Sequence, residues 1–455
     1  MPIGTMTSKR AWPGPTGGLG GSIWEAWEDP LGLFTDGLRD HGNYARFSFG
    51  WLHYHLVNDP RGAHHLLVEN AKNYVKSRNY AGLKLMLGQG LLTSEGDYWK
   101  RQRRLAQPAF HRQRLAGFAT TMAECTRDML TRWDRDLVPG KVRFDLHSEL
   151  MRLTFRIVGR TLLSTELDGL SREFGDALNT ALKWTNDYVE SIVKVPPWVP
   201  TPSNRRFRRA QTTIDGLVMR IIGERRAEPA GVRHDDLLGM LMEIKDEATG
   251  ESMSDRQLKD ELVTMVLAGH ETTANALSFA FYLLSRHPDV ARRVRDEADA
   301  ALGDRDPELA DLPKLPYAKA VIEESMRLYP PAWVVERDAL EADEIGGFPI
   351  PKGGTVAVSP FVMHRHPDHW ENPEGFDPAR FVTPDPTRHK LAYMPFGAGP
   401  RTCIGNAFAM MEMQIVLPMI ARRVRPELEP NAKVELDASV TLRPKSGVPM
   451  RLRAI

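Results

Sequence analysis

One cysteine of the chain stands in a setting that favours thiolate chemistry. Cys403 lies in the glycine-rich stretch PFGAGPRTCIGNAF, directly before a segment with the apolar periodicity of a helix. A helix N-terminus and nearby backbone N–H groups lower the pKa of a thiol. Gly397, Gly399 and Gly405 leave room for a flat cofactor against this loop, and Arg401 can pair with an anionic group. Taken alone, such a cysteine is more often an inert buried residue.

A second candidate site lies in the middle of a long helical pattern. Residues 254–286 begin with Ser254 and Gln257 in the spacing of a capping box and end before Pro288. This pattern predicts a helix about 50 Å long. Its centre, residues 268–273, reads AGHETT, where a purely structural helix would carry leucine or alanine. Local departures of this kind often mark functional sites.

The cysteine segment resembles the haem-binding signature of the cytochromes P-450. The family pattern Phe-x-x-Gly-x-Arg-x-Cys-x-Gly is met in full by Phe396, Gly399, Arg401, Cys403 and Gly405. The resemblance implies that Cys403 is the axial ligand of the iron of haem b, iron protoporphyrin IX. It also implies that Phe396 packs beside the sulfur, that Gly397 leaves space for the haem, and that Arg401 contacts a propionate. Thiolate donation then favours O–O cleavage.

The mid-helix segment is similar to the oxygen-activation segment of the same family. Ala268, Gly269, Glu271 and Thr272 occupy its matching positions. The resemblance implies that Thr272, and after it Glu271, hold water and pass protons to bound dioxygen. His270 matches no family role, and we expect it to make a satisfied polar contact.

Three further segments follow the order of the family. Trp99 and Arg103 match its Trp-x-x-x-Arg segment, which implies that both contact a haem propionate, as does Arg337 after the Pro-Pro turn. Glu324 and Arg327 match its Glu-x-x-Arg pair, whereas on spacing alone they would be a surface ion pair. With Arg380 from the segment FDPARF, they are expected to support the fold.

The family's substrate-lining segments carry apolar or small residues in this chain. These residues are Leu91, Leu92, Ala268, Ala332, Trp333 and Val334. Such a lining suits a fatty acid, a terpenoid or a steroid-like molecule, because a buried polar group would need partners that this set does not supply. The alternative is that Leu91 and Trp333 are ordinary core residues.

The elements that must position these residues are mostly helical. Residues 1–22 are predicted to be an extended lead-in rich in proline and glycine, and 23–455 a single domain. The resemblance implies a mostly α fold with small β-sheets and a haem between the long central helix and the cysteine loop. Periodicity predicts a hairpin at 44–57, helices at 98–137 and 150–163, and strands within 344–361.

Composition narrows the class of protein. The 60 basic and 59 acidic side chains of the 455 residues leave a net charge of +1, which gives no bulk affinity for nucleic acid or anionic membranes. The two cysteines cannot form a disulfide framework, and Cys125 is interpreted as an inert buried residue. The first residues lack an apolar stretch. We therefore expect a cytoplasmic protein without a membrane anchor.

The electrons must come from a separate protein, because no flavin or iron–sulfur motif is present. A ferredoxin or flavodoxin-type donor with its reductase is expected, and a basic cluster could dock it. The alternative is that this cluster is only a solvated basic surface without a docking role. This cluster comprises Lys100, Arg101, Arg104, Arg112, Arg422, Arg423 and Arg425. The predicted activity is insertion of one oxygen atom of dioxygen into a C–H bond. The alternatives are a peroxide-driven hydroxylase, a haem-thiolate isomerase, and a non-catalytic haem-thiolate sensor or electron carrier, which the Thr272 hydroxyl disfavours.

Overall fold

The computed structural model describes most of the chain. The described residues are 10–15, 25, 28–49, 52–110, 112–136, 143–164, 171–191, 194–229, 232, 234–246 and 249–454. They form two compact units. The sheet unit comprises Met1–Asn79, Arg327–Gly375 and Asp385–Cys403, and the helical unit comprises Tyr80–Met326, Phe376–Pro384 and Ile404–Ile455. Most of the predicted lead-in lies outside the described residues, and the single domain over 23–455 stays a prediction.

The sheet unit is built on a five-stranded sheet with the order β1-β2-β8-β5-β3. The strands are β1 (Tyr44–Phe49), β2 (Leu52–Val57), β3 (Tyr74–Lys76), β5 (Val335–Ala339) and β8 (Thr355–Val358). β1 and β2 pair antiparallel from Tyr44 opposite Val57 to Phe49 opposite Leu52, which confirms the predicted hairpin. Its turn, Gly50 and Trp51, is outside the described residues. β2 and β8 run parallel.

The strand-like stretch 344–361 is divided into several short strands: the end of β6, β7 and β8. Glycines with positive φ lie between these strands. β6 (Asp343–Ile345) and β7 (Phe348–Ile350) pair around Gly346 and Gly347, whose φ angles are 62° and 87°. Glycine adopts such angles readily because it has no Cβ. The helical segments of this unit are α2 (Pro30–His41), α3 (Pro60–His64), η1 (His65–Glu69), η2 (Ala71–Asn73), α14 (Pro360–Met363), η6 (Lys390–Ala392) and η7 (Gly399–Arg401).

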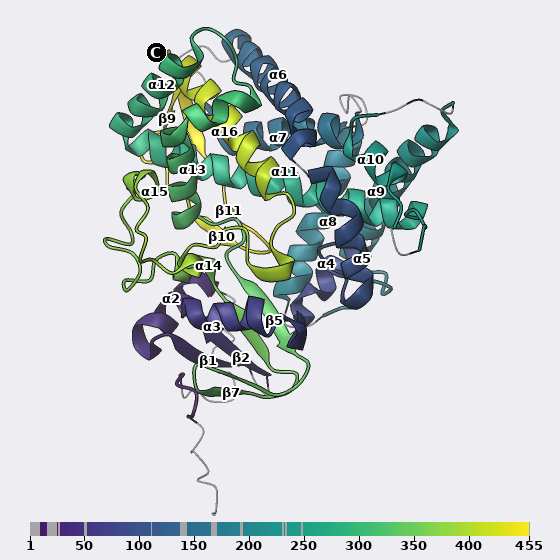
Figure 1. Cartoon of the computed structure of the whole chain (residues 1–455), viewed down its shortest axis with the longest axis vertical. Helices are drawn as coiled ribbons and strands as arrows, with labels where there is room; N and C mark the ends of the chain where they lie inside the picture. Colours follow the sequence, from purple (N-terminus) through teal and green to yellow (C-terminus); the bar gives the residue numbers. More distant parts are fainter. Residues whose placement is uncertain are drawn as a thin grey trace, which may run out of the picture. The chain divides into compact units, whose positions relative to one another are not determined.

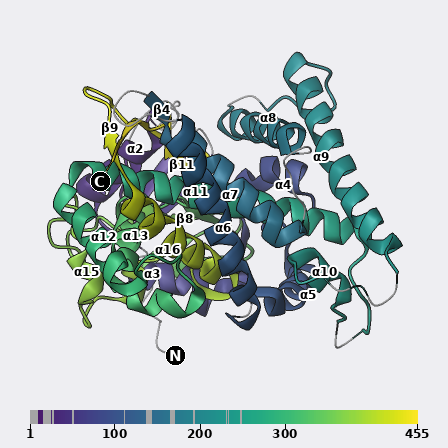
Figure 2. The ribbon, with the colours of Figure 1, turned by 90° about the horizontal axis from the view of Figure 1, so that it is seen from above.

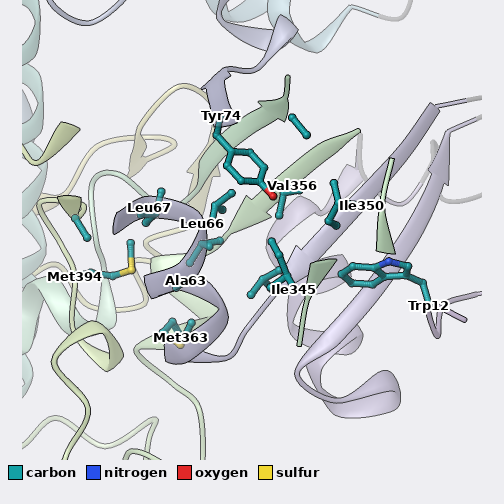
Figure 3. Packing of buried hydrophobic residues seen from close by; sticks show 14 residues of the cluster. Trp12, Ala63, Leu66, Leu67, Tyr74, Ile345, Ile350, Val356, Met363 and Met394 are labelled. Atoms are coloured by element: carbon teal, nitrogen blue, oxygen red, sulfur yellow. The ribbon is translucent and has the colours of Figure 1, made fainter. Parts of the chain in front are cut away.

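A hydrophobic cluster of 14 buried residues forms part of the core of the sheet unit (Figure 3). Ala63, Leu66 and Leu67 from α3 and η1 pack with Val356 of the sheet in this cluster. Met394 belongs to the same cluster, and its backbone N–H donates to Nε2 of the buried His364 at 2.8 Å. The segment that leads into the cysteine loop is therefore anchored in the core.

The helical unit surrounds α11 (Asp255–Arg286), which packs against α7, α9 and α16 (Figure 1). α8 and α9 lie side by side, as Figure 2 shows from above. Its other helices are η3 (Arg78–Tyr80, which begins in the sheet unit), α4 (Ala81–Leu87), α5 (Gly96–Ala106), η4 (Gln107–Phe110), α6 (Arg112–Asp136), α7 (Leu146–Leu163), α8 (Ser171–Glu190), α9 (Pro202–Ala227), α10 (Leu237–Glu243), α12 (Pro288–Leu302), η5 (Leu309–Lys314), α13 (Pro316–Leu328), α15 (Ala379–Val382) and α16 (Asn406–Arg423).

Two small sheets complete the helical unit. One has the order β4-β12-β9, formed by β4 (Arg143–Asp145), β12 (Pro449–Ala454) and β9 (Val424–Leu428). The other is the hairpin of β10 (Leu436–Ala438) and β11 (Leu442–Pro444). Within the described ranges, no helix combines the length and the apolar character needed to cross a membrane.

The predicted central helix is confirmed, with its capping box formed in both directions by Ser254 and Gln257. The single helix predicted for 98–137 is wrong, since α5 and α6 are separated by η4, which contains Pro108. Proline has no N–H to donate and disfavours the helical conformation of the residue before it. α7 begins before the predicted Leu150, because Asp145 caps the backbone N–H groups of His147 and Ser148.

Candidate active site

The cysteine loop has an open side and a closed side. The Cys403 N–H donates to the Phe396 carbonyl at 2.9 Å, and the Cys403 side chain is exposed. Gly397 and Gly399 have φ angles of 70° and 69°. A Cβ on Gly399 would lie 1.8 Å from the Leu67 carbonyl oxygen, whereas a Cβ on Gly397 would meet nothing within 4 Å. The loop is thus pressed onto η1 at one glycine and open at the other.

These features fit a flat macrocycle bound through sulfur. A thiolate is a suitable iron ligand, and the open side at Gly397 offers the space that such a ring needs. Arg337 on β5 is buried and donates from Nη1 to the Glu336 carbonyl at 2.8 Å. A guanidinium has five N–H donors, so Arg337 can also bind an anionic group.

The middle of α11 exposes one narrow face. From Asp260 to Phe281, all of which the structure describes, every residue is buried except Ala268, Gly269 and Thr272. Their spacing of one and four residues places them within one turn of the helix. The Thr272 hydroxyl donates to the Ala268 carbonyl at 2.6 Å. The accessible face, Ala268, Gly269 and Thr272, therefore coincides with the segment predicted to activate oxygen.

Glu271 points to the C-terminal hairpin. It is buried, and its Oε1 accepts from the Thr441 hydroxyl at 2.8 Å and lies 4.0 Å from Nη1 of Arg443. Arg443 also pairs with Asp437 at 2.9 Å, and Asn275 donates to the Thr441 hydroxyl oxygen at 3.3 Å. Thr441 and Arg443 were not predicted, because nothing in the local sequence marks a contact across 170 residues.

The predicted supporting residues make buried polar contacts. In the helical unit, Glu324 is fully buried, accepts from the Asp377 N–H at 2.9 Å and lies 3.4 Å from Nε of Arg380. In the sheet unit, the buried Arg327 donates to three carbonyl groups. They belong to His364, Pro373 and Gly375, at 2.9, 2.6 and 2.8 Å. These bonds hold the segment that follows α14.

Comparison with known proteins decides the family. The family model for cytochrome P450 matches residues 19–448. The chain belongs to the cytochrome P450 family. It is 34% identical over 410 residues to cyclooctat-9-en-7-ol 5-monooxygenase of Streptomyces melanosporofaciens, covering 89% of this chain and 87% of that protein. It is 30% identical over 439 residues to pentalenene oxygenase of Streptomyces avermitilis, with 95% of both covered.

A solved P450 structure matches the whole fold. The crystal structure of the cytochrome P450DA heme domain superposes with a TM-score of 0.88 at 27% identity, covering 97% of each chain. The expected mostly helical fold with small sheets is confirmed. Together with the monooxygenases among its relatives, the family makes this chain a haem-thiolate monooxygenase.

The remaining residues predicted from the P450 motifs have varied surroundings. Trp99 and Arg103 are half-buried on α5. Leu91, Leu92 and Val334 are half-buried, and Ala332 is exposed. Trp333 is buried, with its ring centroid 5.7 Å from that of Phe34. That contact is one that any core tryptophan could make, so the role of Trp333 in a pocket stays a prediction, as do the other assignments.

Two residues of the P450 were expected to have no role in the chemistry: His270, with a satisfied polar contact, and Cys125, as a buried residue. The Nδ1 atom of His270 lies 2.9 Å from the Val266 carbonyl oxygen, and burial lowers the pKa of His270. Cys125 is buried beside Arg160, and burial raises its pKa. The satisfied contact of His270 and the burial of Cys125 are both confirmed.

The basic residues predicted to dock an electron donor are largely paired with acids. Arg104 lies 2.7 Å from Asp246, and Arg423 lies 2.5 Å from Asp134. Lys100, Arg101, Arg422 and Arg425 also pair with Asp or Glu side chains. The side chain of Arg112 lies outside the described residues. These ion pairs reduce the local positive charge that the sequence suggested.

Proposed function

We propose that this P450 inserts one oxygen atom of dioxygen into a C–H bond of a small apolar substrate, with a terpenoid or steroid-like molecule or a fatty acid as the candidates. The observation that carries this proposal is the accessible face at Ala268, Gly269 and Thr272 on an otherwise buried stretch of helix. Two relatives support a terpenoid, since their names give cyclooctat-9-en-7-ol and pentalenene as the molecules oxidised.

The cofactor proposed for this reaction is haem b. Cys403 would hold its iron, Phe396 and Gly397 would lie against the ring, and Arg401, Trp99, Arg103 and Arg337 would bind its propionates. When bound, the haem supplies reductive activation of dioxygen. The exposed thiol and the open side at Gly397 support this assignment.

Thr272 and Glu271 are proposed to move protons. The Thr272 hydroxyl lies on the accessible face, where it can hold a water molecule or donate a proton to bound dioxygen. Glu271 lies next to it in the chain but points to Thr441 and the partly exposed Arg443. Glu271 can therefore take protons from the solvent side and return them towards Thr272.

The electrons are proposed to come from a ferredoxin or flavodoxin-type protein with its reductase. Arg423 and Arg104 remain largely exposed although each pairs with an acid. Both side chains of the Arg423–Asp134 pair are exposed, and such a pair exchanges partners at small cost, because it is worth only about 0–1 kcal/mol, whereas the Asp246 partner of Arg104 is buried. An acidic donor can thus compete for the Arg423 guanidinium group.

The decisive experiment combines a spectrum with turnover. Reduced protein with carbon monoxide is expected to show the thiolate-ligated absorption band, and Cys403→Ser is expected to lose it. Turnover of terpene probes such as farnesene with a surrogate ferredoxin system should then consume dioxygen and yield hydroxylated product. Product formed only with peroxide would favour a peroxide-driven enzyme, and a normal spectrum without any product would favour a sensor. Absence of the band would refute the haem-thiolate assignment.

A further inference from the structure

Glu261 is a buried acid that the oxygen chemistry does not use. It lies on α11, seven residues before Ala268 and eleven before Thr272. At 100° per residue these spacings place Glu261 within about 20° of both residues around the helix axis, and about 10 Å along the axis from Ala268. Glu261 therefore shares the side of α11 that becomes accessible at Ala268.

Only one oxygen of the Glu261 carboxyl group is satisfied. Oε2 accepts from the Leu91 N–H at 3.0 Å, while Oε1 has no hydrogen-bond partner among the described residues. The side chain is 1% exposed. Leaving a buried polar atom unpaired costs about 1–3 kcal/mol. Such an atom in a native protein calls for an explanation, and a ligand is one.

The loop that carries Leu91 is fixed against α11 by its backbone. The Gln89 N–H donates to the Asp260 carboxylate at 2.9 Å. A Cβ on Gly90 would lie 2.0 Å from the Thr264 hydroxyl oxygen and 2.7 Å from the Asp260 carbonyl oxygen. The loop thus lies in direct contact with the helix. Glu261 Oε2 is committed to this contact, which leaves Oε1 as the buried oxygen without a partner among the described residues.

We propose that Glu261 is a substrate-anchoring residue, whose Oε1 hydrogen-bonds to an oxygen atom that the apolar substrate already carries. This inference rests on the proposed function, because it assumes that the accessible face of α11 receives the substrate. It modifies the wholly apolar lining expected from the sequence. The substrate class becomes an apolar alcohol or ketone, so an earlier oxygen-introducing reaction must supply it.

The protonation state of Glu261 suits this role. Burial, together with the nearby charge of Asp260, raises the pKa of Glu261 to about 8, despite the opposing hydrogen bond from Leu91. A protonated carboxyl group both donates and accepts a hydrogen bond. It can therefore bind a hydroxyl or a carbonyl oxygen without placing a charge in an apolar site.

Binding of matched probes tests the anchor without relying on turnover. Equilibrium dialysis of the holoenzyme would compare farnesene with farnesol and myrcene with geraniol, after correction for partition measured with an unrelated protein. We expect at least one alcohol to bind the wild type roughly tenfold more tightly than its hydrocarbon, as one hydrogen bond of about 1.4 kcal/mol provides. Glu261→Gln should keep most of this preference and Glu261→Leu should abolish it.

Two results would overturn the anchor. One is equal affinity for alcohol and hydrocarbon in both pairs with the wild type, which requires no variant to fold. The other is a preference that survives in Glu261→Leu. The proposed function would be refuted by other observations, namely absence of the carbon monoxide band or of product. The two failures can therefore be told apart.

Discussion

Two acids of α11 differ in how fully their carboxyl groups are paired. Glu271 is held by Thr441 and lies near Arg443, so both a neutral and a charged partner face it. Glu261 accepts one backbone N–H at Oε2, and its Oε1 has no partner within the part of the chain that the structure describes. Paired acids can serve as proton donors with a fixed orientation, whereas a half-paired acid has binding capacity left for a ligand.

Replacing Thr272 by alanine tests its place in proton delivery. Without the hydroxyl on the accessible face, we expect electrons to be consumed with several-fold less product, and peroxide to be released instead. The ratio of product to reductant consumed measures this effect. Thr273→Ala is the matched control, because it removes a neighbouring buried hydroxyl that has no partner among the described residues. Equal coupling in the two variants would count against Thr272.

Replacing Thr441 by valine tests how Glu271 is positioned. Valine keeps the shape but removes the hydrogen bond to Glu271 Oε1. We expect slower proton delivery, seen as a larger solvent isotope effect on turnover, and a loss of about 1–3 kcal/mol in the free energy of unfolding. Thr441→Ser should restore both values. An unchanged isotope effect with lowered stability would assign Thr441 a purely structural role.

The raised pKa of Glu261 makes stability depend on pH. The folded protein keeps the proton up to a pKa of about 8, while the unfolded chain releases it near the ordinary value of 4.5. The contribution of the Glu261 proton to the free energy of unfolding is thus full below pH 4.5 and is lost as the pH rises to about 8. Relative to Glu261→Gln, the wild type should lose up to roughly 1.4 kcal/mol per pH unit. Parallel profiles from denaturant unfolding of the two proteins would contradict this expectation.

At the scale of elements, the cysteine loop depends on its contact with η1. Gly399→Ala would place a methyl group against the Leu67 carbonyl at a φ of 69°. We expect the loop to shift, with a loss of more than about 1–2 kcal/mol of stability and poor haem retention. Gly397→Ala is the control for the unfolding free energy of the haem-free protein, because Gly397 is itself proposed to lie against the haem; its φ is the same within a degree, but its Cβ would meet nothing within 4 Å. Equal losses of unfolding free energy in both variants would show that the contact with Leu67 does not determine the effect.

The same scale explains why α5 and α6 are separate helices. Pro108 cannot donate a helical hydrogen bond, and the chain forms the short η4 turn around it. Apolar periodicity continues across this break, so a periodic pattern alone predicted one helix. The proline was visible in the sequence and should have ended the first helix.

At the scale of the whole molecule, the proposed docking of an electron donor depends on surface charge. We expect Arg423→Glu combined with Arg112→Glu to slow reduction by an acidic ferredoxin several-fold at low salt, since steering depends on charge complementarity. Stopped-flow reduction under carbon monoxide measures the rate. Arg226→Glu is the control, because Arg226 is also an exposed arginine paired with an acid, on α9. Reduction rates equal to that of the wild type at low salt would refute the proposed docking surface.

The sequence by itself determined the features that depend on neighbouring residues. The Cys403 signature, the capped helix α11 and the β1–β2 hairpin follow from short-range spacing, caps and alternation, and α11 and the hairpin appear where they were expected. The family also followed from motifs, because they are local strings. Such features are set by chemistry within a few residues.

Only the tertiary structure decided which groups far apart in the sequence meet. Glu271 contacts Thr441 across 170 positions, and Leu91 binds Glu261 across another 170. Pairing of Arg423 with Asp134 likewise joins separate helices. No local pattern records these contacts, since they arise from how elements pack. For that reason the sequence predicted an apolar substrate site, while the folded chain places Glu261, with one carboxyl oxygen unpartnered among the described residues, on the same side of α11 as Ala268 and Thr272.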